Sequence, residues 1–215
     1  MEEDDKKNPL SIKTTLIGDS GVGKTCIIRR YISNEFSDDL MSTNGVSYSK
    51  RELIIGDRKV QIDLWDTAGQ EEYRALGKHF YKDSYIVLLV YNITNRESFD
   101  NLKNVWYEDL SKYGEEFKVL AIVANKCDLY EQEAIPEKEA RAFAKEKNAI
   151  FMNVSAKNGD NIDNLFDLCL KKYFDPNFQI KIEEKKKADE DSIIIRHKSK
   201  KKKDEYKEKE KKNCC

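Results

Sequence analysis

The chain has 215 residues, of which 37% are charged, and its mean hydropathy is −0.77. This length predicts one globular domain with appendages, because a single hydrophobic core commonly takes about 100–200 residues. Residues 1–180 carry 25 basic and 31 acidic residues, and residues 181–215 carry 14 and 9, so an acidic body precedes a basic tail. An acidic body argues against nucleic acid as its partner, and a basic tail is compatible with an anionic membrane surface.

The first ordered elements are a strand, a glycine-rich loop and a helix. Ile12–Ile17 is apolar and β-branched, as a buried strand should be, and Lys24–Ile32 has the composition of a helix. Between them, Gly18–Thr25 (GDSGVGKT) places two glycines, separated by four residues, directly before Lys-Thr. This is the pattern of a phosphate-binding loop.

In such a loop, backbone N–H groups and the positive end of the helix dipole converge on a phosphate. Gly21 and Gly23 would let the backbone approach closely, Lys24 would reach the β- and γ-phosphates, and Thr25 would place its hydroxyl on Mg²⁺. The alternative is an ordinary glycine-rich turn. The loop alone does not identify the nucleotide.

The remaining pattern predicts an antiparallel hairpin followed by strands alternating with helices. We expect a hairpin of Ser47–Ile55 and Arg58–Trp65, strands Ile86–Val90, Val119–Ala124 and Ile150–Val154, and helices Ser98–Tyr113, Pro136–Lys147 and Ile162–Phe174. These elements predict a three-layer α/β fold, in which helices cover both faces of a six-stranded, mostly parallel sheet with one antiparallel strand. We expect a disordered leader over 1–10, the domain over 11–178 and a hypervariable basic tail over 179–215.

Three further motifs each follow a predicted strand, where a ligand held by the glycine loop could meet them. In Asp66–Glu71 (DTAGQE), a carboxylate can hold the water shell of a metal, and Gly69 can offer its N–H to a γ-phosphate. In Asn125–Asp128 (NKCD), a carboxylate can accept the N1–H and N2–H₂ groups of guanine, which adenine lacks. In Ser155–Lys157 (SAK), backbone N–H groups can bind the guanine carbonyl.

Taken together and in this order, the four motifs resemble those of a small GTPase of the Ras superfamily, over about residues 10–176. The resemblance implies the P-loop GTPase fold, GTP/GDP and Mg²⁺ as ligands, and slow GTP hydrolysis that an activating protein stimulates. It implies Gln70 as the catalytic residue that orients the attacking water. The implied Mg²⁺ ligands are Thr25, Thr43 and, through water, Asp66. The implied nucleotide-binding residues are Ser20, Gly21, Val22, Gly23, Lys24, Thr25, Cys26, Phe36, Thr43, Gly69, Asn125, Lys126, Asp128, Ser155, Ala156 and Lys157.

Within the superfamily the chain is most similar to the Rab branch. Trp65 before DTAGQE, LVYNIT at 89–94, ESFDNLKN at 97–104 and the terminal Cys-Cys carry this likeness. The sequence departs from the Rab pattern at 44–48 (NGVSY), 72–73 (EY) and 80–83 (FYKD), on the surface that Rab effectors recognise. These departures leave the nucleotide motifs intact and put the identity of the partners in doubt.

The resemblance implies a GTP/GDP switch that regulates vesicle-mediated membrane traffic. A Ras- or Rho-type signalling GTPase, a GTP-binding scaffold with little turnover, and an ATP-using P-loop enzyme are the alternatives. NKCD argues against the ATP enzyme, and the presence of Thr43, Gly69 and Gln70 argues for a working switch.

The tail ends in Cys214-Cys215, which in Rabs is doubly geranylgeranylated, and two lipid chains anchor a protein far more stably than one. The resemblance therefore implies a protein, monomeric by expectation, that cycles between the cytosol and the cytoplasmic face of an intracellular membrane. Its implied partners are effectors, an exchange factor, a GTPase-activating protein, an escort protein and a GDP-dissociation inhibitor. Ile193–Ile195 either contacts the escort protein or folds back onto the domain.

Overall fold

The computed structural model describes residues 9–37, 45–67, 81–114 and 117–178. The described residues belong to one compact unit that ends at Phe178. Several residues singled out above lie outside the described residues: Thr43, Gly69, Gln70, Ile193–Ile195, Cys214 and Cys215. Their assigned roles, and the boundaries of the leader and tail, stay predictions. The described strand β1 starts at Leu10, one residue inside the segment expected to be a leader.

A six-stranded sheet forms the centre of the domain, in the order β2-β3-β1-β4-β5-β6. Its strands are β1 (Leu10–Ile17), β2 (Val46–Ile55), β3 (Arg58–Thr67), β4 (Ile86–Asn92), β5 (Val119–Asn125) and β6 (Ile150–Asn153). β2 pairs antiparallel with β3, and every other pairing is parallel. The expected mostly parallel sheet with one antiparallel strand is therefore confirmed.

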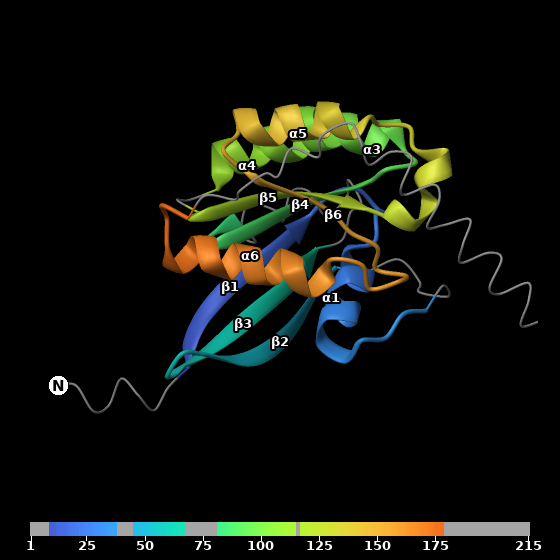
Figure 1. Ribbon diagram of the computed structural model, residues 1–215. Helices are drawn as coiled ribbons and strands as arrows, with labels where there is room; N and C mark the ends of the chain where they lie inside the picture. The colour runs from blue at the N-terminus through green and yellow to red at the C-terminus, as the bar shows by residue number, and fades with distance from the viewer. Residues whose placement is uncertain (1–8, 38–44, 68–80, 115–116, 179–215) are drawn as a thin grey trace, which may run out of the picture. The chain divides into compact units, whose positions relative to one another are not determined.

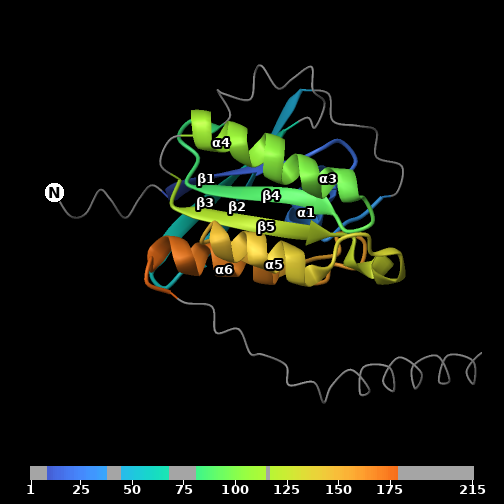
Figure 2. The same ribbon diagram turned by 90° about the horizontal axis from the view of Figure 1, so that it is seen from above.

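Helices cover both faces of this sheet (Figure 1). Their bounds are α1 (Lys24–Ser33), α3 (Arg96–Asn101), η2 (Leu102–Trp106), α4 (Tyr107–Tyr113), η3 (Cys127–Gln132), α5 (Glu137–Glu146) and α6 (Ile162–Phe174). The helices α1 and α6 pack on one face, and α3, η2, α4 and α5 pack on the other. In Figure 2, the view from above, β4 and β5 are visible between α3–α4 and α5, which pack on the same face of the sheet. The predicted three-layer α/β architecture is confirmed.

The central strands β4 and β5 are apolar because both of their faces are buried. Successive side chains of β4 enter different cores: Leu88 and Val90 pack toward α1 and α6, whereas Val87 and Leu89 pack toward α3–α5. A half-exposed strand would have shown alternation of polar and apolar residues instead. The continuous apolar runs thus place these two strands in the middle of the sheet.

The long helix expected from Ser98 differs in two ways. It begins two residues earlier, at Arg96, because the side chain of Asn95 caps it by accepting the Ser98 N–H at 3.2 Å. It also contains a π-helical turn, η2, between α3 and α4, in which the Tyr107 N–H bonds to the Leu102 carbonyl. Periodicity in the sequence did not reveal this turn. In α5, Pro136 lies one position before the helix rather than in its first turn.

Among the described residues, no helix is both long and apolar enough to cross a membrane. The carboxyl ends of β1, β4, β5 and β6 meet at one edge of the sheet, since Ile17 pairs with Leu89, Asn92 with Asn125 and Ala124 with Asn153. The loops that follow β1, β5 and β6 therefore gather at this edge.

The contact between α1 and α6 gives a test of the packing. Phe166 is 1% exposed and stacks on Tyr31 with ring centroids 3.7 Å apart. Phe166→Ala should lower the free energy of unfolding by about 3–5 kcal/mol, because it opens a cavity in the core. Phe174→Ala, at a position on the same helix that is 41% exposed, should cost about 1 kcal/mol or less. Urea unfolding measures both, and equal costs would contradict this packing.

Candidate functional site

The loop after β1 requires glycine where its backbone is left-handed and crowded. Gly21 has φ +75° and Gly23 has φ +97°. A Cβ on Gly23 would overlap the amide nitrogen Nδ2 of Asn125, whereas a Cβ on Gly21 would meet open space. Between them, the side chain of Val22 is 2% exposed and fastens the loop to the core. The loop is therefore held in its shape by the buried valine and by a glycine at which any side chain would be strained.

The N-terminus of α1 is built to receive an anion. Gly23 is the N-cap residue, no side chain caps the helix, and its first turn contains no acidic residue. Gly23 thus offers no side-chain acceptor at the start of α1, and the positive end of the helix dipole meets no acidic partner in the first turn. A phosphate group at this position would supply that partner.

Lys24 is buried beside this helix terminus, and its side chain bonds back to the loop. Its Nζ donates to the carbonyl of Gly18 at 2.7 Å and to the carbonyl of Asp19 at 2.8 Å. Burial lowers the pKa of Lys24 to about 8, although Asp66 and Asp19 oppose this effect. A bound polyphosphate would favour the charged form of the lysine, because an adjacent negative charge offsets the desolvation of an ammonium group.

Thr25 and Asp66 bring a hydroxyl and a carboxylate together next to Lys24. The Thr25 hydroxyl donates to Oδ2 of Asp66 at 2.6 Å, and Asp66 is 3% exposed at the end of β3. The neighbouring Thr67 hydroxyl bonds to the Leu16 carbonyl at 2.7 Å, which holds this strand end against β1. Mg²⁺ prefers such hard oxygen ligands and usually binds one or two protein groups together with substrate phosphates and water. The donor set therefore fits Mg²⁺.

The side chain of Asn125 joins the three loops at the sheet edge. It is 1% exposed; its Nδ2 donates to the Val22 carbonyl at 2.7 Å, and its Oδ1 accepts from the Ala156 N–H at 3.2 Å. Asn125 therefore links the phosphate-binding loop to the Ser155–Lys157 loop. In this structure both ends of its amide group are engaged with backbone.

Asp128 and Ser155, predicted to recognise guanine, lie in direct contact. The Ser155 hydroxyl donates to Oδ1 of Asp128 at 2.6 Å and accepts from the Asn158 N–H at 3.1 Å. This fixes one carboxylate oxygen of Asp128. Within the same segment, Lys126 has a left-handed backbone conformation, with φ +67°. Burial raises the pKa of Cys127 to about 11, so that its thiol is neutral at pH 7. The acidic side chain of the NKCD segment thus has one oxygen held in a defined position.

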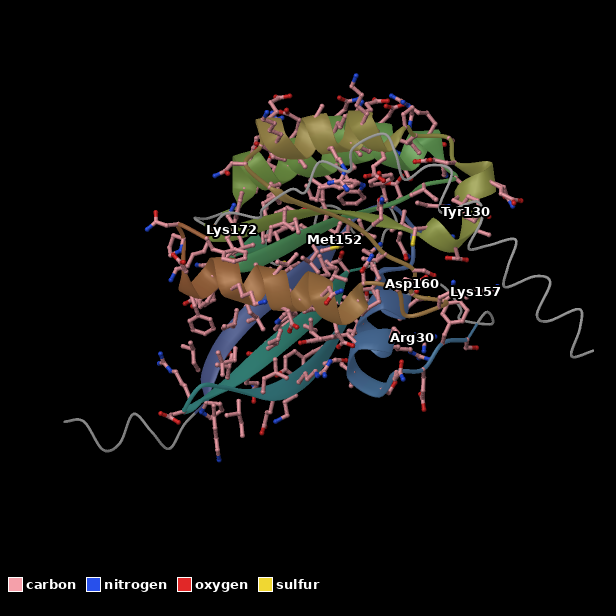
Figure 3. All side chains as sticks on the ribbon, in the orientation of Figure 1. Arg30, Tyr130, Met152, Lys157, Asp160 and Lys172 are labelled. Carbon is pink, nitrogen blue, oxygen red and sulfur yellow. The ribbon has the colours of Figure 1, made fainter. Side chains whose placement is uncertain are left out.

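Arg30 is a site residue that the sequence reasoning missed. From α1, its Nε donates to the Ala156 carbonyl at 2.9 Å, and its Nη2 donates to the Lys157 carbonyl at 2.6 Å. Its Nη1 donates to the carbonyl of Asn34 at 2.6 Å. Figure 3 shows Arg30 lying next to Lys157. No local pattern could have revealed the contacts with Ala156 and Lys157, because more than a hundred residues separate Arg30 from them.

The structure thus brings most of the predicted residues to one edge of the sheet. Ser20 is exposed in the loop, and Cys26 and Phe36 are partly buried against the core. The contacts place Gly21–Thr25, Asp66, Asn125, Asp128 and Ser155–Lys157 in one connected group of loops. Their individual roles toward a ligand stay predictions.

This combination defines a P-loop nucleotide-binding protein. A strand, a glycine loop and an uncapped helix form the phosphate end, an oxygen pair suits Mg²⁺, and a second loop system carries a fixed carboxylate.

Comparison with known proteins identifies the family. Residues 13–175 match the model of the Ras family. The chain is 40% identical over 162 residues to the GTP-binding protein ypt3 of Schizosaccharomyces pombe, an alignment that covers 75% of each chain. It is 40% identical to the Ras-related protein RABA4a of Arabidopsis thaliana and 39% identical to the Ras-related protein Rab11A of Lotus japonicus. Both alignments cover 75% of this chain and 71% of the relative.

The chain therefore belongs to the Ras family. It is a Rab-like small GTPase, which binds GTP and GDP with Mg²⁺ and hydrolyses GTP.

The crowding at Gly23 can be tested by mutation. Gly23→Ala should accelerate GDP release at least about tenfold, because the added Cβ strains a left-handed backbone and displaces the Asn125 amide. Gly56→Ala is the control: Gly56 also has positive φ, +61°, but its added Cβ meets nothing within 4 Å. Release of a fluorescent GDP analogue measures both. Equal rates in the two variants would show that the contact with Asn125 does not matter.

The contacts of Arg30 give a second test. Arg30→Ala removes charge-assisted hydrogen bonds to two carbonyls of the 155–157 loop and should accelerate GDP release about five- to tenfold. Arg29→Ala changes the exposed neighbouring arginine and should leave the rate within about twofold. The same release assay measures both, and an unchanged rate in Arg30→Ala would exclude a role in holding the loop.

Proposed function

We propose that this chain is a Rab-type switch that alternates between GTP- and GDP-bound states on an intracellular membrane and regulates vesicle-mediated traffic. The observation that carries the proposal is the Asn125 bridge between the phosphate-binding loop and the Ser155–Lys157 loop. The bridge couples the part of the site that would hold the phosphates to the part that would hold the base. Binding of the phosphates and binding of the guanine base would therefore depend on each other.

We assign the phosphate end of the nucleotide to Ser20–Cys26. Loop N–H groups and the N-terminus of α1 would bind the β- and γ-phosphates, and Lys24, whose Nζ bonds to the carbonyls of Gly18 and Asp19, would reach the same phosphates. Thr25 and Asp66, with Thr43 outside the described residues, would hold Mg²⁺. Bound Mg²⁺ neutralises charge on the transferred phosphoryl group.

We assign the base end to Phe36, Asn125, Lys126, Asp128 and the 155–157 loop. Asp128 would accept the two guanine donors, and its contact with the Ser155 hydroxyl would hold the carboxylate in position. Adenine would leave this fixed carboxylate without its donors, at a cost of about 1–3 kcal/mol or more. Specificity for guanine would follow from this penalty.

Gln70 would orient the water that attacks the γ-phosphate, and Gly69 and Thr43 would report whether that phosphate is present. An activating protein would supply further charge stabilisation to the transition state. Lipids on Cys214 and Cys215, together with the basic tail, would anchor the protein to the cytoplasmic face of a membrane. Its partners would be exchange factors, effectors, an escort protein and a GDP-dissociation inhibitor.

Single-turnover hydrolysis of bound GTP tests this function. The wild-type chain should hydrolyse GTP slowly, and Gln70→Leu should lower the rate at least about tenfold, because the variant cannot orient the water. Excess ATP should not displace bound GDP. Hydrolysis that is independent of Gln70 would overturn the assigned mechanism, and tight GTP binding without hydrolysis would favour the scaffold instead.

A further inference from the structure

The phosphate-binding loop is held from a third direction, by the helix on the other face of the sheet. The indole Nε1 of Trp106 donates to Oδ1 of Asp19 at 2.6 Å, and Nδ2 of Asn101 donates to Oδ2 of the same carboxylate at 2.9 Å. Trp106 is 5% exposed and packs in the core formed with α3–α5. Both oxygens of Asp19 therefore have a defined partner on this helix.

Asp19 also contributes directly to the position of Lys24. Its backbone carbonyl accepts from Lys24 Nζ at 2.8 Å. One residue thus bonds to Lys24 through its main chain and to Trp106 and Asn101 through its side chain. A shift of the Asp19 carboxylate would therefore also shift the Asp19 carbonyl that accepts the hydrogen bond from Lys24.

The π-helical turn explains how two residues five positions apart reach one carboxylate. In an α-helix such residues point about 140° apart around the axis. The wider turn over Leu102–Trp106 takes up an extra residue and turns Trp106 back toward the side of Asn101. Turns of this kind are frequent at functional sites.

The helix is fixed on its exposed side as well. Arg96 at its start bonds to both carboxylate oxygens of Glu139 on α5, at 2.7 and 2.8 Å. Asn101 and Trp106 are thus presented from a helix tied to its neighbour, and supporting groups are most effective when their own positions are fixed.

We propose that Trp106 and Asn101 are positioning residues of the nucleotide site: they hold the carboxylate of Asp19, keep the phosphate-binding loop in its binding shape, and slow nucleotide release. The inference rests on residues 18–25 being the phosphate-binding loop of the proposed function. The side chains of Trp106 and Asn101 bond to the carboxylate of Asp19. Both act through Asp19, so the conformation of the helix containing η2 sets how tightly the loop retains its ligand.

The first test is the release of fluorescent GDP from the full chain in the presence of Mg²⁺ and excess unlabelled GDP. Trp106→Phe keeps an aromatic ring and removes the N–H donor, and it should accelerate release about tenfold. The matched control is Trp65→Phe, at the other tryptophan of the chain, on β3, which should leave release within about twofold. An unchanged rate in Trp106→Phe would overturn the proposal.

A double-mutant cycle separates this role from a simple loss of packing. In an Asp19→Ala background, Trp106→Phe should change the release rate less than twofold, because the contact is already gone. A further tenfold increase in that background would show that Trp106 acts through packing and would overturn the proposal. If Trp106→Phe does not fold, the same cycle with Asn101→Ala decides. Asn101→Ala should accelerate GDP release severalfold, and this acceleration should disappear in the Asp19→Ala background. An unchanged release rate in Asn101→Ala would overturn the proposal.

Failure of this inference is distinguishable from failure of the proposed site. If Gly23→Ala accelerates release and Trp106→Phe does not, the loop binds the nucleotide and the helix does not control it. If neither variant changes release, the assignment of the loop itself is wrong.

Discussion

The buried amide of Asn125 is the contact on which the rest of the site depends. It satisfies a carbonyl of the phosphate-binding loop and an N–H of the loop after β6, in a place that is closed to water. A buried amide without such partners would cost about 1–3 kcal/mol, so the two loops are stable only in the arrangement that satisfies it. The same amide is the reason that Gly23 cannot carry a side chain. Separate loops thereby become one site.

Around this bridge, the binding surface consists largely of backbone groups, and side chains from outside hold these groups in place. Arg30, on α1, binds the carbonyls of the 155–157 loop. Asp19, held by Trp106 from the opposite face of the sheet, fixes the phosphate-binding loop. The proposed site combines these backbone groups with side chains assigned to the ligand, such as Lys24 and Asp128. Its affinity depends on how firmly the supporting residues hold the loops.

The sheet determines where these supports can come from. Because β1, β4, β5 and β6 are parallel, their carboxyl ends share one edge, and because both faces are covered, a helix on either side can reach that edge. α1 reaches it from one core and η2 from the other. The two cores are therefore connected through the nucleotide loops, which gives a GTPase of this family a physical route between its helices and its ligand.

The sequence by itself determined the fold class, the order of its elements and the family, because strand, loop and helix patterns are local and because each of the four motifs consists of residues that lie within a few positions of one another. It also placed the hairpin and, to within two residues, the ends of the other predicted strands and helices. It could not show the partners of Arg30, of Asp19 or of the Asn125 amide, or the π-helical turn that brings Trp106 to Asp19. Those contacts join residues far apart in the chain, and only tertiary packing decides which of them meet.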